Sequence, residues 1–171
     1  AQGQSVADAI EQALVELMGE QAYASITVKQ ICARAHVSRV SYYRSFSSKE
    51  DVVRRHLSRR MRQILPAGSQ ELHDDEVRSQ LERSLAAIQR NADFFSLLRQ
   101  AGLMYLLYEF FLREGSSYIR RFQPGAVPYQ DTYYTGGTLL VILEWIGRGM
   151  PETPEQLAGI IDTLYYRRNF G

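Results

Sequence analysis

The sequence contains few of the residues that form disulfides or bind metal ions. It has one cysteine, Cys32, and three scattered histidines among 171 residues. An internal disulfide is therefore impossible, and a zinc site built from cysteine and histidine is not expected. The zinc-protease motif H-E-x-x-H is absent as well. We therefore expect no metal and no other cofactor.

Long apolar runs are also missing. No stretch of about 18 apolar residues is present that could span a membrane, and no basic segment followed by an apolar run indicates a signal peptide. The sequence also lacks a nucleophile elbow and a glycine-rich phosphate loop. We therefore expect a cytoplasmic protein that has no membrane partner and is not an enzyme.

Positive charge is distributed unevenly along the chain. The net charge is only +1, yet residues 26–62 contain ten Lys and Arg side chains and two acidic ones. A segment of 37 residues with a charge of +8 indicates a surface that binds a polyanion such as nucleic acid. A solvated basic helix face would have the same composition, so charge alone leaves both interpretations open.

The spacing of apolar residues is helical nearly throughout, and no run alternates as a half-buried strand would. We therefore expect an all-α protein with about nine helices. Three helix starts are indicated by capping motifs, at Thr27-x-x-Gln30, Ser48-x-x-Asp51 and Thr153-Pro154-Glu155-Gln156. The expected helices cover residues 6–19, 28–35, 39–45, 48–65, 74–90, 92–101, 103–122, 129–148 and 154–168.

The second and third expected helices form a helix-turn-helix pattern. Helix 28–35 is followed by a three-residue turn, His36-Val37-Ser38, and by the short helix 39–45. A unit of this kind places its second helix in the major groove of DNA. Two short helices with a tight turn also occur in plain helical bundles, so the spacing by itself is moderately specific.

The residues of this region resemble the N-terminal domain of the TetR family of bacterial regulators. The matching features are the helix that begins at Thr27, the Val37-Ser38 turn, the Ser-x-Tyr-x-x-Phe pattern of residues 41–46, and Ser-Lys-Glu at 48–50. The resemblance covers about residues 5–62. It is looser over 129–168, where Gly136-Gly137, Trp145 and Pro154-Glu155 match one subgroup, and it is absent over about 63–125.

The resemblance implies two domains, a DNA-binding domain at 1–50 and a helical effector-binding and dimerisation domain at 51–171. In the first domain, Arg39 is placed to read guanine, and Val40 is placed to touch a thymine methyl group. Donors at helix ends and flanks would contact phosphates. The DNA-binding residues that we expect are Thr27, Lys29, Ser38, Arg39, Val40, Ser41, Tyr43, Arg44 and Lys49.

Other residues near the turn are expected to have structural roles. Val37, Tyr42 and Phe46 should hold the short helix against the rest of the domain, and Cys32 should be a buried small apolar residue. The sequence departs from the family pattern at His36, which stands where glycine is usual. It departs again at Val40, where glycine or proline is common. A left-handed backbone costs histidine more than glycine, although histidine tolerates it. The chain also begins without the basic arm of many members.

Two glycines interrupt the expected helix 129–148. Together Gly136 and Gly137 cost roughly 2 kcal/mol relative to alanine, so we expect a close approach of helices there. The resemblance implies that the last two helices pair with a second copy in a four-helix bundle, although packing within one chain is the alternative. The expected dimer interface comprises Gly136, Gly137, Leu140, Trp145, Leu157, Ile161 and Leu164.

Aromatic residues are concentrated in the middle of the chain. Aromatic side chains at helical spacing usually belong to a core, but buried tyrosine hydroxyls need polar partners, and an apolar cavity with a few polar groups suits a small molecule. The resemblance implies that an effector binds in this region. The expected effector pocket comprises Phe95, Leu98, Tyr105, Tyr108 and Phe111.

Together these features predict a DNA-binding transcriptional regulator. The form we expect is a homodimeric repressor that binds a palindromic operator and is released by a small, apolar or aromatic effector. The alternative is a helical interaction module that has lost DNA binding, which the departures at His36 and Val40 would allow.

Overall fold

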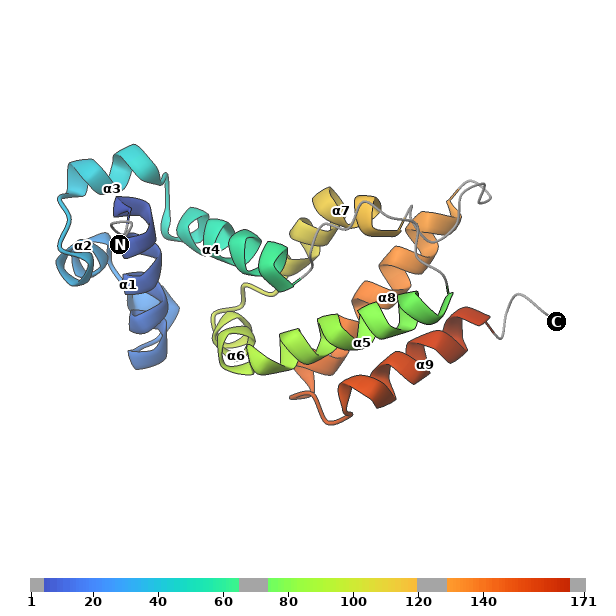
Figure 1. Ribbon diagram of the computed structural model, residues 1–171. Helices are drawn as coiled ribbons and strands as arrows, with labels where there is room; N and C mark the ends of the chain where they lie inside the picture. The colour runs from blue at the N-terminus through green and yellow to red at the C-terminus, as the bar shows by residue number, and fades with distance from the viewer. Residues whose placement is uncertain (1–4, 65–73, 120–128, 167–171) are drawn as a thin grey trace.

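A computed structural model describes residues 5–64, 74–119 and 129–166, and every regular element within these residues is a helix (Figure 1). The N-terminal elements are α1 (Val6–Glu20), a 3-10 turn η1 (Tyr23–Ser25), α2 (Val28–Ala35), α3 (Arg39–Ser45) and α4 (Lys49–Ile64). The C-terminal elements are α5 (Asp74–Arg90), α6 (Ala92–Gln100), α7 (Tyr105–Ile119), α8 (Gln130–Gly147) and α9 (Pro154–Tyr166).

The expected all-α fold is confirmed, with nine α-helices in the described residues. Their bounds agree with the prediction to within one or two residues where both ends are described. The expected helix ends at 120–122 and 167–168 lie outside the described residues. The turn η1 was not predicted, because three residues are too few for a periodic apolar pattern.

The helices form two groups joined by α4 (Figure 1). At one end, α1 packs against α2, α3 and α4. At the other end, α5 packs along α9, and α7 packs along α8. The connecting helix α4 contacts α1 in the first group and both α5 and α7 in the second. Any tilt of α4 would therefore change how the two groups face each other.

Capping residues define where the helices begin. Thr27 and Gln30 form a reciprocal capping box, with Gln30 N donating to Thr27 Oγ1 (3.2 Å) and Thr27 N to Gln30 Oε1 (2.8 Å). Thr153 and Gln156 do the same at α9. The expected box at Ser48 is only half correct, because Asp51 N donates to Ser48 Oγ but the Asp51 carboxylate accepts from Ser47 N instead.

The glycine pair of α8 has no close neighbour among the described residues outside its own stretch of helix. A Cβ atom added at Gly136 or Gly137 would meet no other atom within 4 Å. Close packing against a described helix of the same chain therefore does not explain these glycines. None of the described helices is both long and apolar enough to cross a membrane.

Candidate DNA-binding surface

The turn between α2 and α3 has the geometry that its residues predict. His36 ends α2 in the left-handed conformation (φ 54°, ψ 40°), and Val37 N donates to Cys32 O (3.0 Å). Ser38 then caps α3, accepting a hydrogen bond from Ser41 N (3.0 Å). The hydroxyls of Ser38 and Ser41 also lie 3.0 Å apart. These contacts therefore fix the side chains of both serines at the start of α3.

One side of α3 is fixed in the core of the domain. Tyr42 is fully buried and Phe46 nearly so, and their rings contact each other. Ile31 and Cys32 of α2 are buried beside them, and burial raises the pKa of the Cys32 thiol. Burial also raises the pKa of Tyr42 to about 12. The expected core roles of Tyr42, Phe46 and Cys32 are therefore confirmed.

The opposite side of α3 faces solvent. Val40 is 70% exposed and Tyr43 is 61% exposed. Arg39 and Arg44 are exposed beside them. Positions i, i+1, i+4 and i+5 share one face of a helix, so these four side chains form a single surface, which we call the outer face of α3. A large apolar residue such as Val40 would be poorly placed there unless something covers it.

The start of α2 adds donors near this surface. Thr27 and Lys29 are exposed in the first turn of α2. The first backbone N–H groups of a helix have no partners within the helix and favour anions such as phosphate. The hydroxyl of Thr27 is already committed to its capping box, so Lys29 is the free cationic donor at this position.

Lys49 lies differently from what the sequence suggested. Its Nζ donates to Tyr23 O (2.9 Å) and to Ile26 O (2.6 Å), and it lies 4.6 Å from the centre of the Tyr23 ring. Desolvation at this half-buried position lowers the pKa of Lys49. The side chain therefore fastens the start of α4 to the segment that leads into α2. Sequence reasoning missed Tyr23 as its partner, because no local pattern connects residues 26 positions apart.

Five of the ten basic side chains in residues 26–62 form ion pairs with acidic side chains of the same chain. The guanidinium of Arg34 pairs with Glu20, that of Arg54 with Glu50 and Glu109, and that of Arg62 with Glu114. Arg55 and Arg59 pair with acidic residues of α1, and Arg60 bonds to Asn91. Within residues 26–62, all of which the structure describes, the basic side chains that have neither an ion pair nor a hydrogen bond are Lys29, Arg39 and Arg44. The +8 of this segment therefore overstates the charge that the protein offers to a polyanion.

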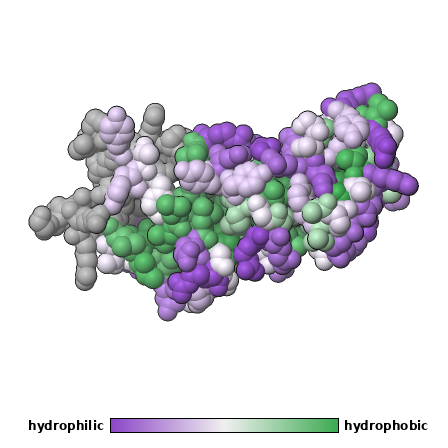
Figure 2. Space-filling view, turned by 180° about the vertical axis from the view of Figure 1, so that it is seen from behind, coloured by the Kyte–Doolittle hydropathy of each residue, from purple (hydrophilic) through white to green (hydrophobic). Residues whose placement is uncertain are grey.

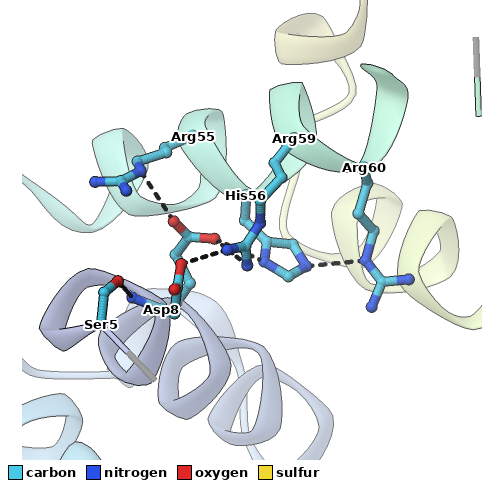
Figure 3. A network of polar contacts seen from close by, with 7 residues as sticks. Ser5, Asp8, Arg55, His56, Arg59 and Arg60 are labelled. Atoms are coloured by element: carbon cyan, nitrogen blue, oxygen red, sulfur yellow. Dashed lines mark hydrogen bonds and ion pairs between the residues drawn. The ribbon is translucent and has the colours of Figure 1, made fainter. Parts of the chain in front are cut away.

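Arginines of α4 meet acidic residues of α1 in a network that the sequence did not reveal (Figure 3). Arg59 pairs with Asp8, whose carboxylate also accepts a hydrogen bond at the start of α1, and with Glu11 (2.7 Å). The hydrogen bond from Ser5 and the nearby Arg59 guanidinium hold the pKa of Asp8 below its usual range. The network fixes α1 to α4 and so positions α2 and α3, which pack on α1.

The expected effector residues differ in how deeply they are buried. Phe95 and Leu98 of α6 are fully buried, whereas Tyr105 and Tyr108 of α7 are 42% and 40% exposed. Phe111 is half-buried. Two surface hollows lie elsewhere, one between α1 and α2 and one along α9. The structure brings Phe95 and Leu98 together in the core and leaves the two tyrosines at the surface.

The expected dimer residues divide into two sets. Trp145, Leu157 and Ile161 are buried within the single chain, at 2%, 3% and 6% exposure. In contrast, Leu140 and Leu164 are 60% and 59% exposed, Gly137 is exposed as well, and Gly136 is half-buried. Only the second set is free to contact another molecule.

Comparison with known proteins agrees with this architecture. Residues 10–55 match the family model described as bacterial regulatory proteins, tetR family. No curated protein matches the sequence. The fold is similar to that of a dihydroxyacetone kinase operon activator, DhaS, with 18% identity, a TM-score of 0.66 and 95% of each chain covered. It is also similar to a TetR transcriptional regulator from Streptococcus agalactiae 2603V, with 17% identity, a TM-score of 0.67, and 93% of this chain and 92% of that chain covered.

The family match and the structure coincide. Residues 10–55 span most of α1, all of α2 and α3, and the first part of α4, which are the elements that build the helix-turn-helix and its outer face. The two solved structures extend the likeness of fold to the C-terminal helices. The N-terminal helices are therefore a helix-turn-helix domain of the kind that the tetR family model describes, and they support a transcriptional regulator that binds DNA through this domain.

Proposed function

We propose that the protein is a homodimeric repressor that binds a near-palindromic operator with one α3 helix per subunit and is released by a small-molecule effector. The observation that carries the proposal is the outer face of α3. It presents Arg39, Val40, Tyr43 and Arg44 to solvent, although two of the four are apolar or aromatic and are more than 60% exposed. Occupation of a major groove would cover this face.

Each exposed residue is assigned a role by its chemistry. Arg39 lies in the first turn of α3, where a guanidinium can bond to guanine O6 and N7, and Val40 offers a methyl contact to thymine. Tyr43, Arg44 and Lys29 would contact phosphates, which position the protein without reading sequence. Ser38 and Ser41 would allow close approach of the backbone. Thr27 and Lys49 act in this proposal by shaping the segment that presents these side chains.

The proposed dimer rests on the apolar surface of α8 and α9 (Figure 2). Leu140 on α8 and Ile160 and Leu164 on α9 are exposed, and a hollow along α9 adjoins the last two. Exposed apolar surface of this kind is typical of an interface between protein chains. Gly136 and Gly137 would let a helix of the second copy approach α8 closely. Trp145, Leu157 and Ile161 would support the interface from beneath.

The proposed effector site lies among α6 and α7, in the C-terminal domain at 51–171. Because Phe95 and Leu98 are fully buried, an apolar or aromatic ligand must separate α6 from its neighbours to enter. A ligand releases DNA only if it binds the DNA-incompetent arrangement more tightly. Since α4 contacts α7, such a separation would move α4 and with it the two α3 helices. A coupling of ~1–3 kcal/mol would lower operator affinity about 5- to 150-fold.

The direction of regulation has a second candidate. One protein of similar fold is named an operon activator, so activation is the alternative to repression. A reporter gene that carries the bound sequence distinguishes the two, because a repressor lowers and an activator raises transcription from it. The helical interaction module without DNA binding is the remaining alternative to both.

The experiment that tests the proposal is selection of bound duplexes from a random DNA pool. We expect a near-palindrome whose half-sites lie about 34–36 Å apart, or a multiple of that distance. Sedimentation of the protein with the recovered duplex should show two subunits per site. If no sequence is enriched, and if the amount of DNA that the protein retains does not depend on salt, the interaction module is supported instead. An enriched sequence bound by one subunit would contradict the dimer.

A further inference from the structure

A buried carboxylate lies between the DNA-binding helices and α4. Glu11 on α1 is fully buried, although acidic side chains are almost never fully buried without partners. It does not belong to the outer face of α3, and the proposed function does not use it. Because the cost of burying a charge is recovered only through its partners, the contacts of Glu11 show what this carboxylate holds together.

Three side chains of α4 converge on the Glu11 carboxylate. Arg59 Nη2 lies 2.7 Å from Oε2, and His56 Nδ1 lies 3.2 Å from the same oxygen. Arg55 Nε lies 3.2 Å from Oε1. Positions i, i+1 and i+4 share one face of a helix, and the three side chains point from α4 toward α1 (Figure 3). Arg59 also pairs with Asp8, one turn before Glu11 on α1. One face of α4 therefore holds one face of α1 through charged groups.

The same contacts reach the end of α3. The guanidinium carbon of Arg55 lies 5.5 Å from the centre of the Phe46 ring, and Phe46 is the residue that directly follows α3. Both α2 and α3 pack on α1, which in turn packs on α4. The junction between α1 and α4 therefore sets where α3 lies relative to α4.

The neighbouring arginine, Arg60, fixes α4 to the C-terminal helices. Its Nη1 donates to Asn91 Oδ1 (2.5 Å), at the link between α5 and α6, and its guanidinium carbon lies 5.1 Å from the centre of the Phe94 ring on α6. Thus α4 has charged contacts to α1 on one side and to the start of α6 on another. In a dimer formed by the C-terminal helices, the separation of the two α3 helices would depend on both junctions.

A buried charge restricts the junction of α1 and α4 more strictly than apolar packing does. Apolar contacts are not directional, so helices that pack only through them can exchange one neighbour for another at small cost. A shift of α1 along α4 would instead take the Glu11 carboxylate away from Arg55 and Arg59 and leave it buried and unpaired, which is strongly unfavourable. A single buried polar residue fixes the register of coiled-coil helices in the same way.

We propose that Glu11 is a positioning residue that determines which spacing between operator half-sites the dimer accepts. It acts through Arg55 and Arg59, and it holds α1, together with α2 and α3, in one place on α4. This inference rests on the proposed dimer, because only a protein with two linked α3 helices distinguishes one spacing from another. Since Glu11 makes no base contact in this proposal, base preference within a half-site should not depend on it.

The experiment measures binding to duplexes that carry the two selected half-sites at three spacings. These are the selected spacing and the spacings one base pair longer and shorter, and each step moves the half-sites by about 3.4 Å and turns them by about 34°. Wild type should bind the selected spacing at least about tenfold more tightly than either neighbour, because a wrong spacing requires deformation of the DNA. In Glu11→Leu this preference should fall to about twofold, because α1 then adjusts on α4 and the DNA is not deformed.

Leucine is chosen so that the variant folds. Replacement of a buried charge by an apolar residue of similar size is often neutral for stability, and Arg55 and Arg59 are half-exposed, so both can turn toward water. The pair of Arg59 with Asp8 would remain, so the double variant Asp8→Asn with Glu11→Leu should discriminate spacings no better than Glu11→Leu alone. Affinity for a duplex with one half-site scrambled should be unchanged in both variants.

The matched control is Glu16→Leu on the same helix. Glu16 is exposed and pairs with Arg34 of α2, so its loss leaves the junction with α4 intact and should keep the wild-type preference. Arg55→Met removes a partner of Glu11 from the α4 side and should also weaken the preference. It serves as the test if thermal unfolding shows that Glu11→Leu does not fold.

Two results would count against the inference in different ways. If Glu11→Leu, or Arg55→Met in its place, is folded and keeps the wild-type preference among the three spacings, the proposal is overturned, even if the variant is less stable. If wild type itself binds all three spacings equally, the dimeric function is contradicted, and the inference fails with it. The first result concerns the variants alone and the second the wild type, so the two failures are distinguishable.

Discussion

The DNA-binding helices and the C-terminal helices have different kinds of surface. In α1 to α4, arginines and acidic residues from different helices pair with each other, and two of the large exposed apolar residues, Val40 and Tyr43, belong to the outer face of α3. In the C-terminal helices, eight large apolar or aromatic residues are at least 40% exposed, namely Tyr105, Tyr108, Leu112, Tyr129, Tyr133, Leu140, Ile160 and Leu164. In the proposed function, DNA would cover the outer face of α3 in the first region, and a second copy of the chain would cover part of the apolar surface of the second.

The strongest way to test this difference is to charge the apolar surface of α8. Leu140→Asp should prevent dimerisation and lower affinity for the paired operator about a hundredfold or more, because the two half-sites are then bound independently. Sedimentation and binding titrations measure the two effects. The matched control is Leu112→Asp on α7, because Leu112 and Leu140 are both 60% exposed. A Leu140→Asp protein that remains dimeric would show that the C-terminal surface has another role.

The next test concerns the exposed cations of the first region. Arg39→Ala should cost ~1–3 kcal/mol on the selected sequence and relax base preference at one position. Lys29→Ala should instead weaken all sequences alike and reduce the slope of log affinity against log salt by about 1 per subunit. Titrations of selected and random duplexes at several salt concentrations separate these outcomes. If the two variants behave identically, Arg39 does not read a base.

A smaller effect is expected at Lys49, whose side chain forms hydrogen bonds within the DNA-binding helices. Lys49→Met removes two hydrogen bonds to the carbonyls of Tyr23 and Ile26, so the free energy of unfolding should fall by about 1–2 kcal/mol. Lys29→Met, at an exposed lysine, should leave stability unchanged. Chemical denaturation measures both. Unchanged stability in Lys49→Met, together with weaker DNA binding, would show that Lys49 contacts phosphate after all.

The smallest expected effect is a gain of stability. The hydroxyl of Tyr42 is buried and has no hydrogen-bond partner among the described residues. Because an unsatisfied buried hydroxyl is unfavourable, Tyr42→Phe should raise the free energy of unfolding by about 1 kcal/mol. Tyr43→Phe, at the exposed neighbouring position, should change stability little. A loss of stability in Tyr42→Phe would indicate that the hydroxyl has a partner, such as a bound water.

Local patterns predicted the fold and much of the candidate site. Helical periodicity, the capping box at Thr27 and the left-handed turn at His36 all depend on residues within four positions of each other, and the structure has them as expected. The burial of Tyr42 and Phe46 follows from the same helical spacing. For these features the sequence neighbours are also the spatial neighbours.

Contacts between distant residues were not predictable in this way. Lys49 bonds to carbonyls 23 and 26 positions away, and Arg62 pairs with Glu114, 52 positions away. A count of basic residues therefore gave this segment a charge of +8, whereas five of its ten cations form ion pairs in the folded protein. The orientation of Tyr105 and Tyr108 could not be derived either, because an aromatic residue at helical spacing packs inward or outward according to which helices surround it.

The internal neutralisation of α4 has a consequence for how the protein finds its site in a genome. Attraction to DNA of any sequence grows with the number of phosphates that a protein neutralises. This attraction accounts for most of the binding to the millions of genomic positions outside the operator. With Lys29, Arg39 and Arg44 as the cations of residues 26–62 that have neither an ion pair nor a hydrogen bond, each subunit would hold random DNA weakly and leave it quickly. A small number of copies per cell could then keep one operator occupied, because few of them would be sequestered elsewhere on the chromosome.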